Sequence, residues 1–110
     1  MNTLLAESLA NAVVALPKEE YALFQNTLIA NLIRKTPGVA GGVACVRNTR
    51  IAVWTLISLA NQGADDAELA LDFPGLTSFD FWTAKIYYQM NRAEIDALIA
   101  ENDREDVWDA

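Results

Sequence analysis

The chain has 110 residues, with one cysteine, no histidine and a formal net charge of −7. A chain of this length fits one domain that buries roughly two thirds of the surface its unfolded form exposes. One cysteine excludes an intrachain disulfide, and without histidine a zinc or iron site needs an unusual all-carboxylate ligand set, so we expect neither a metal nor a cofactor. The net charge argues against nonspecific nucleic-acid binding by the chain as a whole, because phosphate neutralisation needs clustered Lys and Arg.

The start of the chain is apolar, and its length and charges decide how it is interpreted. No apolar run reaches the roughly 18 to 20 residues that span a bilayer. The first apolar stretch carries Glu7 and lacks the basic residues of a secretion signal. We therefore expect a helix of the mature protein, no membrane contact and a cytoplasmic location.

Residues 1–27 predict a helical hairpin that extends a main domain of residues 28–110. Apolar residues recur at three- and four-residue steps on both sides of Pro17, which ends the first helix and can open the second. These residues are Leu5, Leu9, Ala12, Val13 and Leu16 in the first helix and Tyr21, Phe24 and Leu28 in the second. Because such stripes need a partner, we expect the hairpin to serve docking or dimerisation and the protein to be a homodimer.

Between residues 28 and 53, glycines and β-branched residues replace the helical pattern. We expect one or two short β-segments in this part of the chain. The candidate strand residues are Val43, Val46, Ile51 and Val53. Asn48 lies at the centre of a predicted tight turn, where asparagine tolerates a positive φ.

Four further helices are predicted between residues 54 and 100. The first is short and ends at Gly63, because glycine is the usual residue just after a helix. Three pairs of polar residues have the capping-box spacing of three positions at the starts of the other helices. These pairs are Asp65 with Glu68, Thr77 with Asp80, and Asn91 with Glu94.

The apolar residues of the last two helices predict their buried faces. These residues are Phe79, Trp82, Ile86 and Met90 in the third helix, and Ile95, Leu98 and Ile99 in the fourth. Two short helices and a longer one, separated by tight turns, have the layout of a helix-turn-helix unit. The sequence thus predicts a mainly α fold with a helix-turn-helix three-helix core, a short β-element and an N-terminal helical hairpin.

Three elements, in order along the chain, carry a family resemblance. They read TPGVAGGVACVRNTRIAVWTL, then GADDAELALDFPGLT, then the aromatic third helix. Over about residues 32–100 the chain resembles the bacterial domain-of-unknown-function family 433, whose turn usually reads R-G-T-R where this chain has Asn48. The resemblance implies a homeodomain-like core and an antitoxin-like role with a PIN-like toxin nuclease as partner.

The third helix carries a polar stripe that is a candidate DNA contact. Lys85, Tyr88, Gln89 and Arg92 fall at positions i, i+3, i+4 and i+7. In a DNA-binding module this stripe would lie in the major groove, with the cations on phosphate or guanine and the glutamine on adenine. The alternative is an ordinary solvated helix face.

Two arginines in the predicted β-turn are a second candidate contact. Arg47 and Arg50 flank the turn within residues 28–53, which contain no acidic residue. Guanidinium groups bind planar oxyanions through two parallel hydrogen bonds, so the pair could clamp a phosphate or a partner carboxylate. The alternative is an internal ion pair with Asp72 or Asp80 that fixes the turn onto the helices.

The C-terminal tail combines acidic residues with one aromatic side chain. The candidate partner-binding residues are Glu101, Asp103, Glu105, Asp106 and Trp108. Such a segment could bind a basic groove on a partner, as an antitoxin tail does. The alternative is a frayed, solvated terminus.

No residue pattern points to an enzyme. Cys45 is interpreted as an inert buried thiol, because no histidine is present to activate it, and we assign no catalytic residue. The preferred hypothesis is an antitoxin or transcriptional-regulator-type partner protein that contacts a toxin and DNA. The alternative is a protein-interaction or dimerisation module that never contacts DNA.

Overall fold

The computed structural model describes residues 3–109, with side chains described for residues 4–103. Within them the chain is mainly helical with one small sheet, which confirms the predicted mainly α fold with a short β-element. The elements are α1 (Thr3–Val14), α2 (Lys18–Leu32), β1 (Ile33–Lys35), the 3-10 turn η1 (Ala40–Gly42), β2 (Ala44–Val46), α3 (Val53–Asn61), α4 (Asp66–Asp72), α5 (Ser78–Met90) and α6 (Arg92–Asp109).

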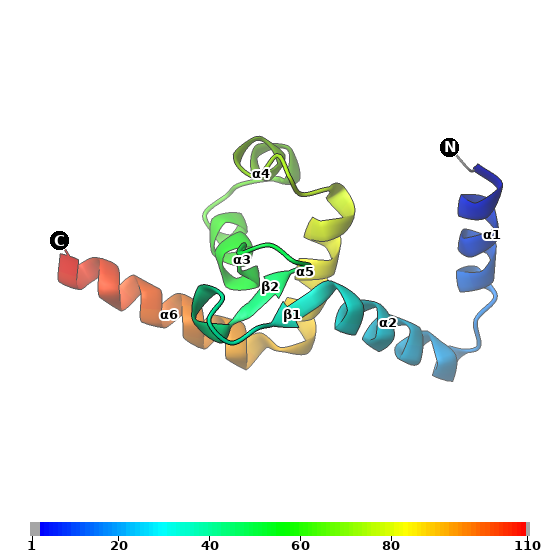
Figure 1. Ribbon diagram of the computed structural model, residues 1–110, viewed down its shortest axis with the longest axis horizontal. Helices are drawn as coiled ribbons and strands as arrows, with labels where there is room; N and C mark the ends of the chain where they lie inside the picture. Colours follow the sequence, from blue (N-terminus) through cyan, green and yellow to red (C-terminus); the bar gives the residue numbers. More distant parts are fainter. Residues whose placement is uncertain (1–2, 110) are drawn as a thin grey trace.

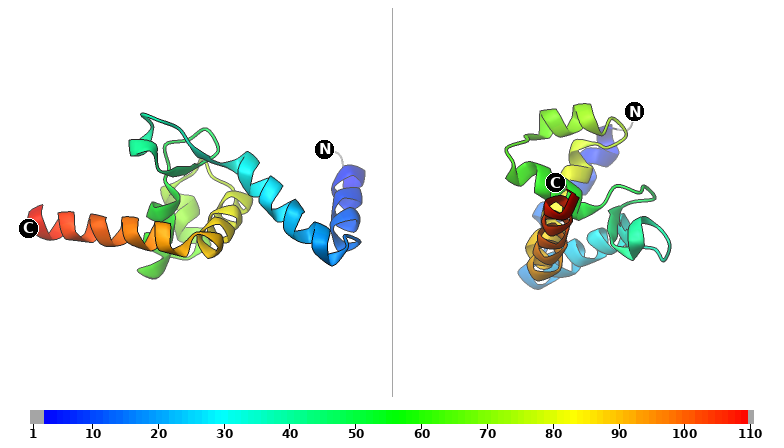
Figure 2. Two further views of the ribbon diagram at one scale, coloured as in Figure 1. Left: turned by 90° about the horizontal axis from the view of Figure 1, so that it is seen from below. Right: turned by 90° about the vertical axis from the view of Figure 1, so that its left-hand side faces the viewer.

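The elements form a central body with a projection at each end (Figure 1). The body consists of α3, α4, α5 and the two strands, whereas α2 leads from it to α1 on one side and α6 extends on the other. Figure 2 shows that α1 and α2 open as a V and that the outer part of α6 stands clear of the body. The radius of gyration is therefore 16.0 Å, against about 13 Å for a compact chain of this length.

The N-terminal helices meet at Pro17 as predicted, but the second is longer than expected. α2 continues to Leu32 instead of ending near Leu28, and Ile29 in its last turns is buried in the core. α1 stays outside this core, with Leu4 and Val14 exposed by 74% and 85%. No helix among residues 3–109 combines the length and apolar character needed to cross a membrane.

The sheet has two antiparallel strands, β1 and β2, with Ile33 opposite Val46. An isolated bridge pairs Cys45 with Ala52 on the other edge of β2. Val53, predicted to lie in a strand, is instead the first residue of α3, because pairing stops at Ala52 and the chain turns into the helix there. The expected tight turn lies between Val46 and Ile51, whose backbone groups are hydrogen bonded at 3.0 Å.

The helix boundaries follow the predicted local signals, with one exception. Gly63, with φ of 107°, ends α3, while Asp65 caps α4 and Thr77 forms a full capping box with Asp80 at the start of α5. The Asn91 pair does not form a capping box. The Asn91 side chain donates back to the carbonyl of Tyr87, and the Glu94 carboxylate accepts from the Tyr87 hydroxyl instead.

The predicted buried face of α5 is wrong. Phe79, Trp82 and Met90 are 47%, 41% and 48% exposed, and Ile86 is only partly buried. The residues that face the core are Asp80, Phe81, Thr83, Ala84 and Tyr87. The helix is rotated from the expected orientation because two polar residues, Asp80 and Thr83, are buried with satisfied hydrogen bonds. The prediction for α6 holds, since Ile95 is buried and Leu98 and Ile99 pack against the core.

Candidate functional site

The polar stripe of α5 faces carboxylates of the same chain. The Lys85 ammonium lies 2.9 Å from the Asp66 carboxylate at the start of α4. The Tyr88 hydroxyl donates to the Asp96 carboxylate at 2.9 Å, which raises the pKa of Tyr88. Gln89 is exposed. A phosphate approaching this stripe would therefore meet two carboxylates beside one paired lysine.

Arg92 does not continue the stripe as the sequence predicted. α5 ends at Met90, and Arg92 is the first residue of α6. Asn91 between them has φ of −139° and ψ of 44°, which breaks the helical repeat. The Arg92 guanidinium lies over the Tyr88 ring, 5.2 Å from its centroid, at a distance suited to a cation–π contact.

Arg47 forms the internal ion pair that was the alternative to a phosphate clamp. Its Nε and Nη2 donate to the two carboxylate oxygens of Asp80 at 2.8 and 2.7 Å, and Nη2 also reaches the Gly75 carbonyl at 3.2 Å. Asp72 is not the partner. The left-handed residue of the turn is Arg47, with φ of 47°, and not Asn48 as expected from its tolerance of positive φ. The turn thus directs Arg47 onto the first turn of α5.

Asp80 is the most deeply buried charged residue in the described part of the chain. Its side chain is almost completely buried and accepts from Arg47, from the Thr77 backbone N–H at 2.8 Å and from the Thr77 hydroxyl at 3.2 Å. The hydrogen bonds from Arg47 lower the pKa of Asp80, against the opposing effect of burial. The pair therefore fixes the β-turn to α5, and Arg47 has a structural role.

A second ionic cluster binds the sheet to the C-terminal helices. The Lys35 ammonium lies 3.1 Å from Glu94, which also accepts from the Tyr87 hydroxyl at 2.9 and 3.0 Å. Burial raises the pKa of Tyr87, and the bond to Glu94 raises it further. Two of the four cations in the acid-free segment, Lys35 and Arg47, are thus neutralised by acids of α5 and α6.

Arg34 and Arg50 remain exposed and form no ion pair with any residue whose side chain is described. Arg34 lines a small hollow of about 180 Å³, and Arg50 does not line it. The other lining residues are Thr36, Val39, Cys45, Arg47, Asn48 and Thr49. Burial raises the pKa of the Cys45 thiol, which disfavours the reactive thiolate.

The acidic tail lies on a continuous helix. α6 runs from Arg92 to Asp109 and leaves the body along most of its outer half (Figure 1). Glu101 and Asp103 are exposed on it. The side chains of Glu105, Asp106 and Trp108 lie outside the described residues, so the predicted partner-binding role of these three stays a prediction.

An apolar groove lies beside the N-terminal helices. Its volume is about 520 Å³, and it lies between the V of α1 and α2 and the start of α5. Phe79 and Trp82 form its α5 side, with stacked rings 5.6 Å apart. The remaining lining residues are Leu9, Ala10, Val13, Tyr21, Phe24 and Leu28. The sequence indicated the contribution of the N-terminal helices and missed that of α5.

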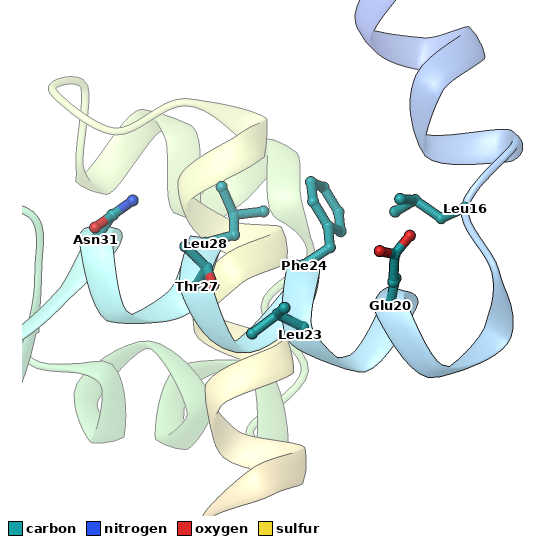
Figure 3. A pocket seen from close by; sticks show the side chains of 7 residues that line it. All are labelled: Leu16, Glu20, Leu23, Phe24, Thr27, Leu28 and Asn31. Atoms are coloured by element: carbon teal, nitrogen blue, oxygen red, sulfur yellow. The ribbon is translucent and has the colours of Figure 1, made fainter.

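A second apolar hollow of about 440 Å³ follows α2 along its length. Figure 3 shows Phe24 and Leu28 on one side of α2, with Leu16 and the Glu20 carboxylate near its start. Phe24 and Leu28 line both hollows. The exposed apolar surface of the N-terminal helices is therefore continuous around α2.

The site and the fold define a small helical protein with a short sheet, an open apolar groove and paired cations. The family described as "Protein of unknown function (DUF433)" matches residues 33–88, about half of the chain. The chain belongs to this DUF433 family, as the sequence motifs implied.

A solved structure extends this comparison beyond the family segment. The crystal structure of a DUF433 member protein from Anabaena variabilis ATCC 29413 is 45% identical, with a TM-score of 0.63. The match covers 91% of this chain and 99% of that one. Residues 28–110 make up only about three quarters of the chain, so the match must extend into the N-terminal helices. No curated protein matches the chain.

Proposed function

We propose that this protein is a protein-interaction module that does not read DNA through helix α5. This is the second of the two functions that the sequence suggested. It is supported by the distribution of charge and apolar surface. The net charge is −7, whereas proteins that bind DNA neutralise phosphates with clustered Lys and Arg.

The contacts of the candidate DNA-contacting cations that lie on or against α5 carry the proposal, whereas Arg50 stays exposed. Lys85 is held by Asp66, and Arg47 is held by Asp80. Arg92 starts a different helix and stacks on Tyr88. A DNA phosphate would have to displace these carboxylates, and the displaced acids would then repel it. A large exposed apolar surface, in contrast, lies on α1, α2 and the start of α5.

A DNA titration tests the proposal. The full-length protein is titrated into a fluorescently labelled random-sequence duplex at low salt, and anisotropy is measured. Nonspecific DNA binders reach dissociation constants of about 10⁻⁴ to 10⁻⁶ M at physiological salt. We expect no saturation up to about 10⁻⁴ M even at low salt. Saturable, salt-dependent binding that is lost in Lys85→Ala and kept in the matched control Lys18→Ala would contradict the proposal.

An antitoxin-type role is the second candidate, and the acidic outer half of α6 favours it. This helix projects from the body and exposes Glu101 and Asp103. A preformed acidic helix loses less entropy on binding a basic groove than a disordered tail does. The chain would then bind a basic partner, such as the nuclease that the family resemblance implies, through α6 while its N-terminal surface remains available.

A truncation experiment tests this candidate. The tagged full-length chain and a variant that ends at Asp103 are purified from the native host at low salt. The candidate requires that one protein co-purify in stoichiometric amount with the full-length chain and be lost from the truncated chain. Equal recovery with both chains, or recovery of none, would contradict it.

A further inference from the structure

α1 has the composition of a buried helix but is exposed in the single chain. Glu7 is its only charged residue among twelve. Its three leucines and Val14 are exposed, with Leu4 at 74% and Val14 at 85%. A helix that is apolar around most of its circumference is normally covered on most sides. In Figure 2 no other element lies along the outer side of α1.

The amount of exposed surface fits a homodimer interface. The solvent-accessible surface of the chain is 7593 Å², whereas a compact monomer of 12.1 kDa exposes about 6,000 Å². The excess is about 1,600 Å² per chain, roughly twice the 800 Å² that each partner contributes to a standard interface. Part of it belongs to α6, and the remainder still suits an apolar, permanent homodimer interface.

The charges of the N-terminal helices favour burial of their apolar surface by a protein and not by a lipid surface. Helices that lie on membranes carry Lys and Arg on their polar face. α1 has none, and the single Lys18 of α2 is followed by Glu19 and Glu20. Anionic lipid headgroups would therefore repel this surface. A second copy of the chain, in contrast, supplies both an apolar helix and an apolar groove to receive it.

We infer that two copies form a two-fold dimer in which α1 of each copy enters the groove between α1, α2 and α5 of the other. Phe79 and Trp82 form the base on which the incoming helix packs, which explains why two large aromatic side chains of α5 point away from the core. This inference rests on the proposed function and names its partner. In a symmetric dimer each contact is made twice, so the groove and the helix complement each other in both copies.

Sedimentation equilibrium of the full-length chain tests the dimer, with two matched leucine substitutions. Leu9 lines the groove and Leu71 lies on α4 with 83% exposure, and both side chains are more than half exposed in the single chain. Either leucine can therefore become glutamate without burying a charge in the folded monomer. We expect Leu9→Glu to weaken dimerisation by about 100-fold or more, because the new carboxylate is buried in the interface. Leu71→Glu should leave the dimer unchanged. A monomeric wild-type chain, or equal effects of the two substitutions, would overturn the inference.

A crosslinking experiment tests the exchange of α1. A photo-reactive residue replaces Ala10 in a light copy, which is mixed with an isotopically heavy copy that lacks it. The inference requires crosslinks from light α1 to heavy residues 78–90. Crosslinks confined to one copy would overturn the inferred exchange of α1 between copies. Vesicle binding by a monomeric chain would overturn it too, because a lipid surface, and not a second copy, would then cover α1. The DNA titration described above is independent of these outcomes, so failure of the dimer and failure of the proposed function are distinguishable.

Discussion

The two ends of helix α2 belong to regions that are stabilised in different ways. At its C-terminal end, Ile29 packs into a core that is closed by the Arg47–Asp80 pair and by the Tyr87–Glu94–Lys35 cluster. At its N-terminal end, α2 and α1 expose apolar side chains and have no ion pair among the residues described. The body is thus complete in one chain, whereas the N-terminal pair leaves an apolar surface that the proposed second copy would bury.

Loss of a core side chain should have the largest effect on stability. Ile95 of α6 is 1% exposed, and Ile95→Ala should lower the free energy of unfolding by about 2–5 kcal/mol. Urea unfolding measures this effect. Because the cavity lies within one chain, the loss should not depend on protein concentration. A loss that disappears at high concentration would show that the body, too, depends on a partner.

Loss of the buried carboxylate should have the next largest effect. Asp80→Ala removes both hydrogen bonds to Arg47 and the capping box of α5, and should cost about 2–3 kcal/mol. The full cost of breaking a buried pair is avoided because Arg47 keeps access to water. Asp66→Ala, the control, breaks only the exposed pair with Lys85 and should cost less than about 1 kcal/mol. Equal losses in the two variants would contradict a structural role for the Arg47 pair.

The same pair predicts how stability depends on pH. The pKa of Asp80 is lowered in the folded chain, while an unfolded aspartate titrates at about 3.9. The stabilisation is therefore fully present above about pH 5 and is lost as the pH falls below about 4 through the lowered folded pKa. The stability difference between wild type and Asp80→Asn should shrink in this range. A difference that stays constant between about pH 7 and pH 3 would contradict this origin.

The hydroxyl of Tyr87 should contribute the smallest of these effects. Tyr87→Phe leaves Glu94 with Lys35 as its partner and should cost about 1 kcal/mol, equivalent to roughly 4–8 °C in Tm. Thermal unfolding followed by circular dichroism measures it. Tyr21→Phe provides the control on α2, since it keeps the ring that contacts Phe24. An unchanged Tm in Tyr87→Phe would show that the cluster does not stabilise the body.

The elements of the body were predictable from sequence because local signals define them. Gly63, Asp65 and the Thr77–Asp80 pair mark helix ends through hydrogen bonds between near neighbours. The turn was less predictable, because its positive φ falls on Arg47, whose conformation is held by a bond to Asp80 thirty-three residues away.

The orientation of α5 was not predictable from hydrophobicity alone. The apolar periodicity predicted the largest apolar residues, Phe79 and Trp82, on the buried face. The predicted alternative, an Arg47–Asp80 ion pair, indicates the orientation of α5, because Asp80 then faces the turn and the body. At about 100° per residue, Trp82 then lies roughly opposite Asp80 on the helix, and Phe79 lies on the flank next to Trp82. An exposed apolar groove, which the proposed second copy would complete, leaves the same sequence signal as a core.

Hydrogen–deuterium exchange at several protein concentrations tests whether α1 is covered by a second copy of the chain. An isolated helix of twelve residues is marginal in water, so α1 in a monomer should exchange rapidly. In the proposed dimer, residues 4–14 should become protected as the concentration rises through the dimer dissociation constant, while the protection of α3 and α5 near the core should stay constant. Rapid exchange of α1 at all concentrations, with the body fully protected, would contradict it.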